Sequence, residues 1–230
     1  PRRRAHMEQH TGQGVMSAAF DRLFGVRTTS FHLGADVSTI DLAREVTPRE
    51  ISDAEAEANR IVWEARPVVV RFVTEEEAAA LPLRKEPVKT GTLRLINVTD
   101  FDLSACGGTH VPQTGLIGGI GIAAWERFKG ATRLTFVCGG RLLASHGKLR
   151  DAVLSATRAL SIGPAELAAS IERLQSEQKS SVREIRRLQE ELAIGRAAAL
   201  RASAVAVGPF RVVFLHEPGA DAAALKTLAS

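Results

Sequence analysis

The sequence has few cysteines and no long apolar stretch. Its 230 residues include two cysteines, Cys106 and Cys138, and chains inside the cell rarely keep a disulfide. No apolar run approaches the roughly 18–20 residues that a membrane span needs. The N-terminal residues PRRRAHMEQH also lack the apolar segment of a secretory signal. These absences predict a cytoplasmic protein with no membrane partner.

The composition is that of an ordinary globular protein, with 45% hydrophobic and 24% charged residues. The length suits one good domain plus an appendage. The net charge is +4, and it is uneven, because residues 101–150 carry +4 whereas residues 51–100 carry −2. The positive segment favours a polyanionic partner, although a solvated basic surface would give the same charge.

The pattern of apolar and turn residues predicts an α+β fold, with helices packed on a mostly antiparallel sheet. Thr47, Pro48 and Glu50 form the expected start of a helix with a capping box, and Gly25 is a natural helix stop. We expect helices over residues 8–25, 47–67 and 74–81, and strands over 28–34, 37–43, 68–73, 92–98, 116–128 and 131–140.

From about Arg141 the character of the sequence changes. Residues 141–162 are helical in pattern, Gly163-Pro164 is a break, and a long helix follows to about Ala204. Its apolar seam is interrupted by polar residues, which favours a helical hairpin or arm over a parallel coiled coil. Residues 210–217 and 221–230 predict one strand and one helix, too little to bury a core. We therefore expect an incomplete C-terminal domain.

Cys106 and His110 lie four residues apart, separated by two glycines and a threonine. As metal ligands they need partners, and His6 and His10 offer two imidazoles on one face of the first helix. Histidines at this spacing are common on surfaces, but their combination with the Cys-His loop favours a metal site. Cys138 ends an apolar strand and is interpreted as a small buried hydrophobic residue.

The motif CGGTHV at 106–111 is preceded by LRLINVTDFDLSA and followed by TGLIGGIGI, and HTGQ opens the series at 10–13. In this order over residues 5–145, the sequence resembles the editing domain of alanyl-tRNA synthetases and the free-standing AlaX-type editing proteins. The resemblance implies an editing domain over 1–145, a helical arm over 146–206, and the start of a DHH-associated domain over 207–230. It also implies that the chain lacks the family's small N-terminal β-barrel domain.

The resemblance implies hydrolysis of tRNA(Ala) mischarged with serine or glycine, at a zinc site made by a His-x3-His helix and a Cys-x3-His loop. His10, Cys106 and His110 match that motif, but Gly14 stands where the fourth ligand is expected. His6 is the substitute hypothesis, although it would shift the metal by about one helical turn, roughly 5 Å. Glycine at position 14 also costs the helix about 1 kcal/mol relative to alanine.

The remaining candidate residues surround this site. A hydroxyl-binding pocket would distinguish serine from alanine, because alanine leaves buried polar groups unpaired. Gly107 and Gly108 allow a close backbone approach, or form a simple tight turn. The candidates for catalysis and substrate binding are Thr11, Gln13, Thr29 and Ser30, and those for phosphate contact or a solvated surface are Arg127, Lys129 and Arg133. Trp63 and Trp125 are expected in the core.

Three function hypotheses follow. The first is a zinc-assisted hydrolase that acts in trans on the acceptor end of tRNA(Ala). The second is a tRNA-binding or dimerisation fragment whose catalysis has decayed because of Gly14. The third is an unrelated zinc-stabilised domain, which the context of the CGGTHV motif argues against. A second copy of the chain, joined through the helical arm, is a further partner hypothesis.

Overall fold

A computed structural model describes residues 2–84 and 91–214, and the chain divides into two compact units, Pro1–Ala152 and Val153–Ser230. The helices are α1 (Arg2–Phe24), α2 (Pro48–Trp63), α3 (Glu75–Ala79), η1 (Thr114–Ile117), α4 (Gly140–Leu160), η2 (Pro164–Glu166) and α5 (Leu167–Ala202). The strands are β1 (Thr28–Leu33), β2 (Ser38–Leu42), β3 (Val68–Val73), β4 (Leu93–Val98), β5 (Asp102–Ala105), β6 (Ile120–Phe128), β7 (Ala131–Cys138), β8 (Val205–Val207) and β9 (Phe210–Val212).

The strands of the first unit form two antiparallel sheets. This confirms the predicted α+β class, but the single predicted sheet is in fact two sheets. One sheet has the order β1-β2-β7-β6, and the other has the order β3-β4-β5. Within the described residues, the short strand β5 pairs with β4 alone, and it leads into the Cys-His segment. The sequence pattern did not separate this four-residue strand from the loop that follows it.

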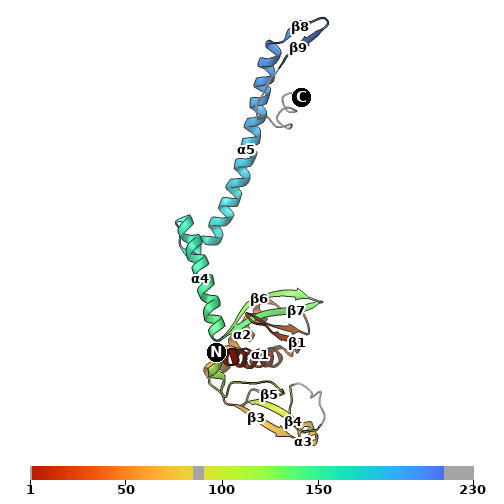
Figure 1. The fold of residues 1–230 in the computed structure, drawn as a ribbon, viewed down its shortest axis with the longest axis vertical. Helices are drawn as coiled ribbons and strands as arrows, with labels where there is room; N and C mark the ends of the chain where they lie inside the picture. The colour runs from red at the N-terminus through yellow and green to blue at the C-terminus, as the bar shows by residue number, and fades with distance from the viewer. Residues whose placement is uncertain (1, 85–90, 215–230) are drawn as a thin grey trace. The chain divides into compact units, whose positions relative to one another are not determined.

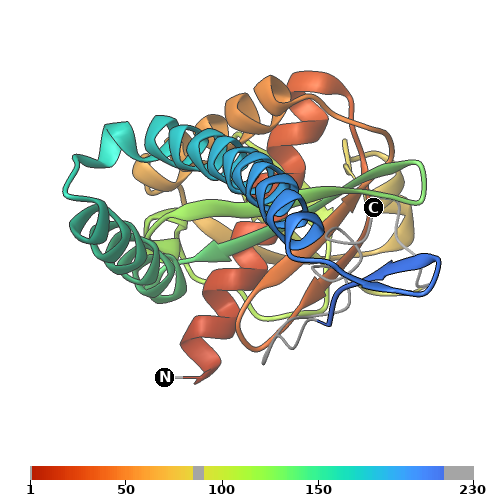
Figure 2. The ribbon, with the colours of Figure 1, turned by 90° about the horizontal axis from the view of Figure 1, so that it is seen from above.

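Helix α1 lies between the two sheets (Figure 1) and contacts strands of both. In Figure 2 it is the red helix that begins at the N-terminus and crosses the first unit. Val15, Met16 and Phe20 of α1 are completely buried, as are Ile40 of β2 and Phe136 of β7. This packing fixes one face of α1 against the four-stranded sheet and α2.

The predicted helix signals are present in the structure. The Thr47 hydroxyl accepts the Glu50 amide at 3.2 Å, and the Glu50 carboxylate accepts the Thr47 amide at 2.7 Å. Pro48 occupies the first turn of α2. Gly25 follows α1 with a φ of +63°, a left-handed conformation that glycine adopts without strain.

The C-terminal segment is helical and then forms a short hairpin. The break at Gly163-Pro164 separates α4 from α5, as predicted, and α5 buries only Ser170. Strands β8 and β9 pair antiparallel, and β9 covers the start of the predicted strand at 210–217. The predicted helix at 221–230 lies outside the described residues. Among the helices within 2–84 and 91–214, none is both long and apolar enough for a membrane span.

The prediction that both tryptophans lie in the core is wrong. Trp63 is 78% exposed and Trp125 is 52% exposed. Trp63 is the last residue of α2, where the helix face turns from the core to solvent. Trp125 lies on β6, an edge strand whose central residues are exposed.

Candidate metal centre

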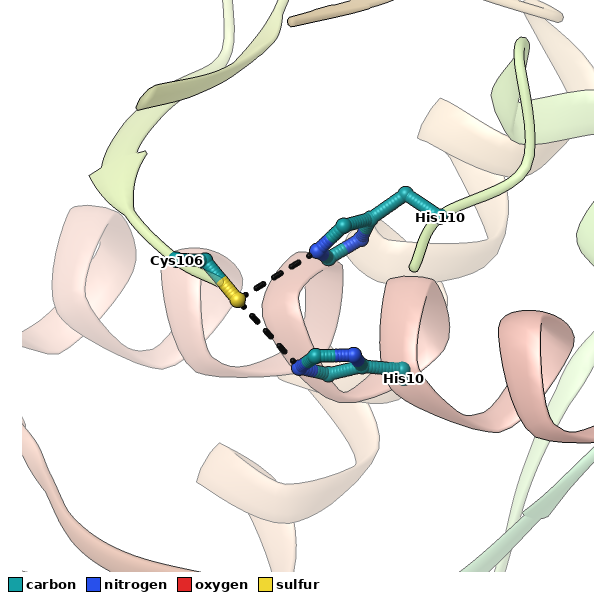
Figure 3. Close-up of side chains that lie close together, drawn as sticks. All are labelled: His10, Cys106 and His110. Atoms are coloured by element: carbon teal, nitrogen blue, oxygen red, sulfur yellow. Dashed lines mark hydrogen bonds between the residues drawn. The ribbon is translucent and has the colours of Figure 1, made fainter. Parts of the chain in front are cut away.

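Three of the four side chains expected at the metal site meet in space (Figure 3). Sγ of Cys106 lies 3.4 Å from Nε2 of His10 and 3.4 Å from Nε2 of His110. The potential ligand atoms of the three residues lie within 4.8 Å of one another. His10 comes from α1, whereas Cys106 and His110 come from the segment after β5. The site therefore joins a helix to a loop almost 100 residues later in the chain.

The Cys-His segment is held by its own backbone and by Arg94 of β4. The Cys106 amide donates to the Arg94 carbonyl at 3.1 Å. Nη1 of Arg94 donates to the carbonyls of Cys106, at 2.6 Å, and of Gly108, at 2.8 Å. Two loop carbonyls thus point at one guanidinium group, which fixes the direction of the thiol. The sequence offered no signal for this role of Arg94.

Of the two loop glycines, only Gly108 makes a close approach. A β-carbon on residue 108 would lie 2.0 Å from Cε1 of His10, whereas one on Gly107 would meet nothing within 4 Å. The Gly108 amide also donates to Sγ of Cys106 at 3.4 Å. Gly108 is therefore needed to bring the loop onto His10, and Gly107 belongs to the exposed part of the turn.

Thr11 orients His110. Its hydroxyl donates to the Met7 carbonyl at 2.9 Å, accepts the Val111 amide at 3.1 Å, and lies 3.3 Å from Nδ1 of His110. A hydroxyl has one proton, so its contact with His110 is satisfied by a proton on Nδ1. That tautomer leaves Nε2 of His110 with its lone pair toward Cys106.

The environment favours the metal-binding forms of both residue types. Burial lowers the pKa of His10, and the positive charge of Arg94 acts in the same direction. Burial opposes ionisation of Cys106, but the adjacent His110, the hydrogen bond from the Gly108 amide and the positive charge of Arg94 together lower the pKa of the thiol. A neutral imidazole and an accessible thiolate are the forms that bind zinc.

Cys138 has a different environment. It is completely buried, as predicted, and burial raises the pKa of its thiol. A β-carbon on Gly12 would lie 2.4 Å from Sγ of Cys138, so α1 packs closely on the end of β7. Cys138 is thus part of the core, whereas Cys106 faces the site.

A cavity of about 330 Å³ adjoins the three converging side chains. Several predicted site residues line it: His10, Thr11, Gln13, Gly14, Thr29, Ser30, Cys106 and His110. Gly14 leaves open space on this side, because an added β-carbon would meet nothing within 4 Å. His6 is exposed and is not in the three-residue cluster found within the described ranges; its ring centroid is 6.2 Å from that of His10.

The hydroxyls of β1 face two directions. Thr29 donates to the Asp41 carbonyl at 3.1 Å, and Ser30 donates to the Asp41 carboxylate at 2.6 Å, so both hold β1 against β2. Thr28, which sequence reasoning missed, lines the cavity and donates to Ser17 at 2.7 Å. Gln13 donates to the same Ser17 hydroxyl at 2.8 Å. Gln13 and Thr28 are therefore held together at one wall.

A second polar wall consists of Arg84, Asp102 and Ser104, which sequence reasoning also missed. Arg84 donates to the two carboxylate oxygens of Asp102 at 2.7 and 3.1 Å, and to Ser104 at 2.9 Å. Ser104 donates to Asp102 at 2.9 Å. All three residues line the cavity. The sequence offers one signal for two of them. Asp102, Ser104 and Cys106 occupy every second position along β5 and the residue after it, and such positions point to the same face of a strand.

The three predicted phosphate contacts lie outside the lining of the cavity. Arg127 pairs with Glu45 at 2.8 Å, and Arg133 pairs with Asp41 at 2.7 Å. Nζ of Lys129 lies 5.1 Å from the centre of the Phe128 ring. These side chains belong to the β6–β7 hairpin, and two of the three cations are paired with carboxylates.

Comparisons with known proteins agree with the site. Residues 93–135 match the threonyl and alanyl tRNA synthetase second additional domain. The chain is 34% identical to an alanine–tRNA ligase of Pyrococcus abyssi over 84% of its length, and 32% identical to one of Methanosarcina mazei over all of it. It is 35% identical to the alanyl-tRNA editing protein AlaX-L of Pyrococcus horikoshii over 65% of its length.

These matches cover 22%, 26% and 38% of the three relatives, so the chain spans a minor part of each. The resemblance inferred from the CGGTHV motif is confirmed. The chain contains a domain related to the editing domains of alanyl-tRNA synthetases and AlaX-type proteins.

Proposed function

We propose that the chain hydrolyses the ester bond of tRNA(Ala) mischarged with serine or glycine, acting in trans with zinc. The observation that carries this proposal is the convergence of His10, Cys106 and His110 beside a cavity, within a domain related to alanyl-tRNA editing proteins. As a protein acting on charged tRNA, it is assigned to the cytoplasm.

The donor set fits zinc. One thiolate and two imidazoles are common zinc ligands, and three protein ligands leave one position for water or substrate, as in catalytic zinc sites. When bound, zinc would supply an activated water or polarise the ester carbonyl. His10, with its lowered pKa, stays neutral for binding, and Thr11 keeps Nε2 of His110 directed at the site.

We assign recognition of the amino-acid side chain to Gln13 and Thr28. Both line the cavity and both donate to the buried Ser17 hydroxyl, which fixes their orientation. A seryl hydroxyl placed between them would complete their hydrogen bonding, and a methyl group would not. Thr29 and Ser30 then act indirectly, because their hydrogen bonds to Asp41 hold β1 in place.

The terminal nucleotide of the tRNA acceptor end would enter the cavity. Arg84 lines the cavity, and its Nη1 has no hydrogen-bond partner among the described residues, so this atom would be the donor to a phosphate. Arg127, Lys129 and Arg133 remain proposals for contacts farther along the acceptor arm. Such contacts release counterions, so binding should weaken as the salt concentration rises.

The test is deacylation of Ser-tRNA(Ala), Gly-tRNA(Ala) and Ala-tRNA(Ala) by the purified chain, with zinc measured by elemental analysis. The proposal expects hydrolysis of the first or second substrate in preference to the third. It also expects loss of activity in Cys106→Ala, which removes the only cysteine at the site. Undiminished hydrolysis by Cys106→Ala would refute a metal role for this residue.

A catalytically impaired tRNA-binding or dimerisation fragment is the second candidate, and Gly14 at the fourth-ligand position favours it.

We propose a second copy of this chain as the partner of the α5 arm, because the apolar side chains of Val182, Ile185 and Leu188 are 49–60% exposed there. Light scattering of the full chain tests this pairing. The proposed domains are the editing domain over 1–145, the helical arm over 146–206 and the start of a DHH-associated domain over 207–230.

A further inference from the structure

The rings of His110, His10 and Phe31 follow one another from the candidate metal centre along the lining of the cavity. The ring centroids of His110 and His10 are 4.4 Å apart with an interplanar angle of 30°, and those of His10 and Phe31 are 5.9 Å apart with an angle of 29°. Phe31 lines the cavity and is 45% exposed. Among the described residues, no ring other than His10 stacks on Phe31.

The position of Phe31 on β1 explains this exposure. Strand β1 is an edge of its sheet, and Phe31 pairs with the completely buried Ile40 of β2. Residues directly opposite each other in an antiparallel pair point to the same face. Phe31 therefore points to the face of the sheet that covers α1, at the edge, where none of the described strands lies beyond β1.

We propose that Phe31 is the platform on which the unpaired terminal base of the RNA substrate stacks. This inference rests on the proposed function, in which the reacting ester is carried by the ribose of that same terminal nucleotide. Binding that places the ester at the centre also brings the attached base close to it. An exposed ring beside the centre offers a planar purine the surface that single-stranded bases prefer.

The polar residues Arg84, Asp102 and Ser104 of the same cavity suit the rest of the nucleotide. The Arg84 guanidinium is held by Asp102 and Ser104, with side-chain exposures of 17% for Arg84 and 7% for Asp102. The guanidinium is paired with the Asp102 carboxylate, so it would offer a phosphate an oriented N–H donor rather than an unpaired positive charge. The cavity lining thus combines an aromatic ring with an oriented guanidinium donor, and the two together suit the base and the phosphate of a nucleotide.

The test uses the trinucleotide CpCpA with 2-aminopurine in place of the terminal adenine, added to the zinc-loaded full chain. Stacking quenches the fluorescence of 2-aminopurine, so the wild-type chain and Phe31→Trp should quench it on binding. Phe31→Leu keeps an apolar side chain against His10 but removes the ring. It should weaken binding by about 5- to 150-fold, the range of one base–aromatic stack.

Two controls separate stacking from a merely structural role. Phe210→Leu makes the same change at a phenylalanine that is 71% exposed in the second unit, and it should change nothing. A trinucleotide with an abasic 3′ residue should bind equally to wild type and Phe31→Leu. Zinc content, measured on every variant, should be the same.

Equal quenching and affinity in wild type and Phe31→Leu would overturn the inference. So would a variant in which only the ratio of seryl to glycyl ester hydrolysis changes, because Phe31 would then contact the amino acid. The proposed function can fail while this inference stands. A chain that stacks the base on Phe31 but hydrolyses no ester would support the stacking role and refute the proposed activity.

Discussion

The backbone of Gly108 lies against the imidazole of His10 so closely that a β-carbon on residue 108 would be 2.0 Å from Cε1 of the ring. The ring of His10 is buried between His110 and Phe31 and cannot move aside without breaking the cluster. The contact explains why the loop between Cys106 and His110 has a glycine at this position.

We expect Gly108→Ala to abolish zinc binding and deacylation, because the methyl group must displace either the loop or His10. Gly107→Ala is the matched control: its β-carbon meets nothing within 4 Å, and the residue has no positive φ. Zinc content and the thermal midpoint should fall in the first variant and stay unchanged in the second. Equal zinc content in the two variants would contradict the role assigned to this contact.

Gly14→His should raise zinc content, because position 14 faces the cavity and has room for a side chain. Gly14→Ala separates the two effects of this change. Alanine improves the helix by about 1 kcal/mol and supplies no imidazole, so it should raise the free energy of unfolding but not the zinc affinity. A wild-type chain that holds one full equivalent of zinc and loses it in His6→Ala would show that His6 completes the site instead.

Arg94→Leu should lower zinc affinity by about 10- to 100-fold, the usual effect of removing a group that orients a metal ligand. The variant leaves the carbonyls of Cys106 and Gly108 without their shared donor. Arg71→Leu on the neighbouring strand removes an exposed arginine and serves as the control. Competition with a zinc chelator measures both, and equal affinities would remove Arg94 from the site.

Thr28→Val should reduce kcat/KM for Ser-tRNA(Ala) by roughly threefold to tenfold, the effect of one lost hydrogen bond. The glycyl ester has no hydroxyl and should be affected less. Thr29→Val makes the same change one residue later, where the hydroxyl donates to Asp41 outside this network. If the two variants lose the same activity, the serine pocket is not built on Thr28.

The zinc-free chain should lose stability as the pH falls below about 6.5, the ordinary pKa of histidine. Burial lowers the pKa of His10 in the folded state, so the unfolded chain binds a proton that the folded chain resists. The contribution is fully present above the unfolded pKa and is lost as the pH falls through the folded one. Urea unfolding of wild type and His10→Gln between pH 5 and pH 7.5 measures it. The wild-type stability should show the steeper dependence on pH.

Local signals in the sequence were sufficient for much of the fold. Thr47, Pro48 and Glu50 specify the start of α2 through contacts within one helical turn, and Gly25 specifies the end of α1 through its left-handed backbone. The CGGTHV motif likewise marked the family, because its residues are contiguous. Such features depend on neighbours in the chain, so they can be predicted without knowing the tertiary structure.

Other features depend on residues that are distant in the sequence. The exposure of Trp125 follows from the position of β6 at a sheet edge, and β5 was missed because only its pairing with β4 makes it a strand. Arg84, Asp102 and Thr28 come to the cavity from three separate segments. No local pattern distinguishes Thr28 from Thr29; the pairing with β2 decides, because a register shift between Thr28 and Ser30 interrupts the alternation of faces along β1. The sequence by itself determined most helices and strands and the residue types of the candidate site, whereas only the tertiary packing decided which side chains share the cavity with them.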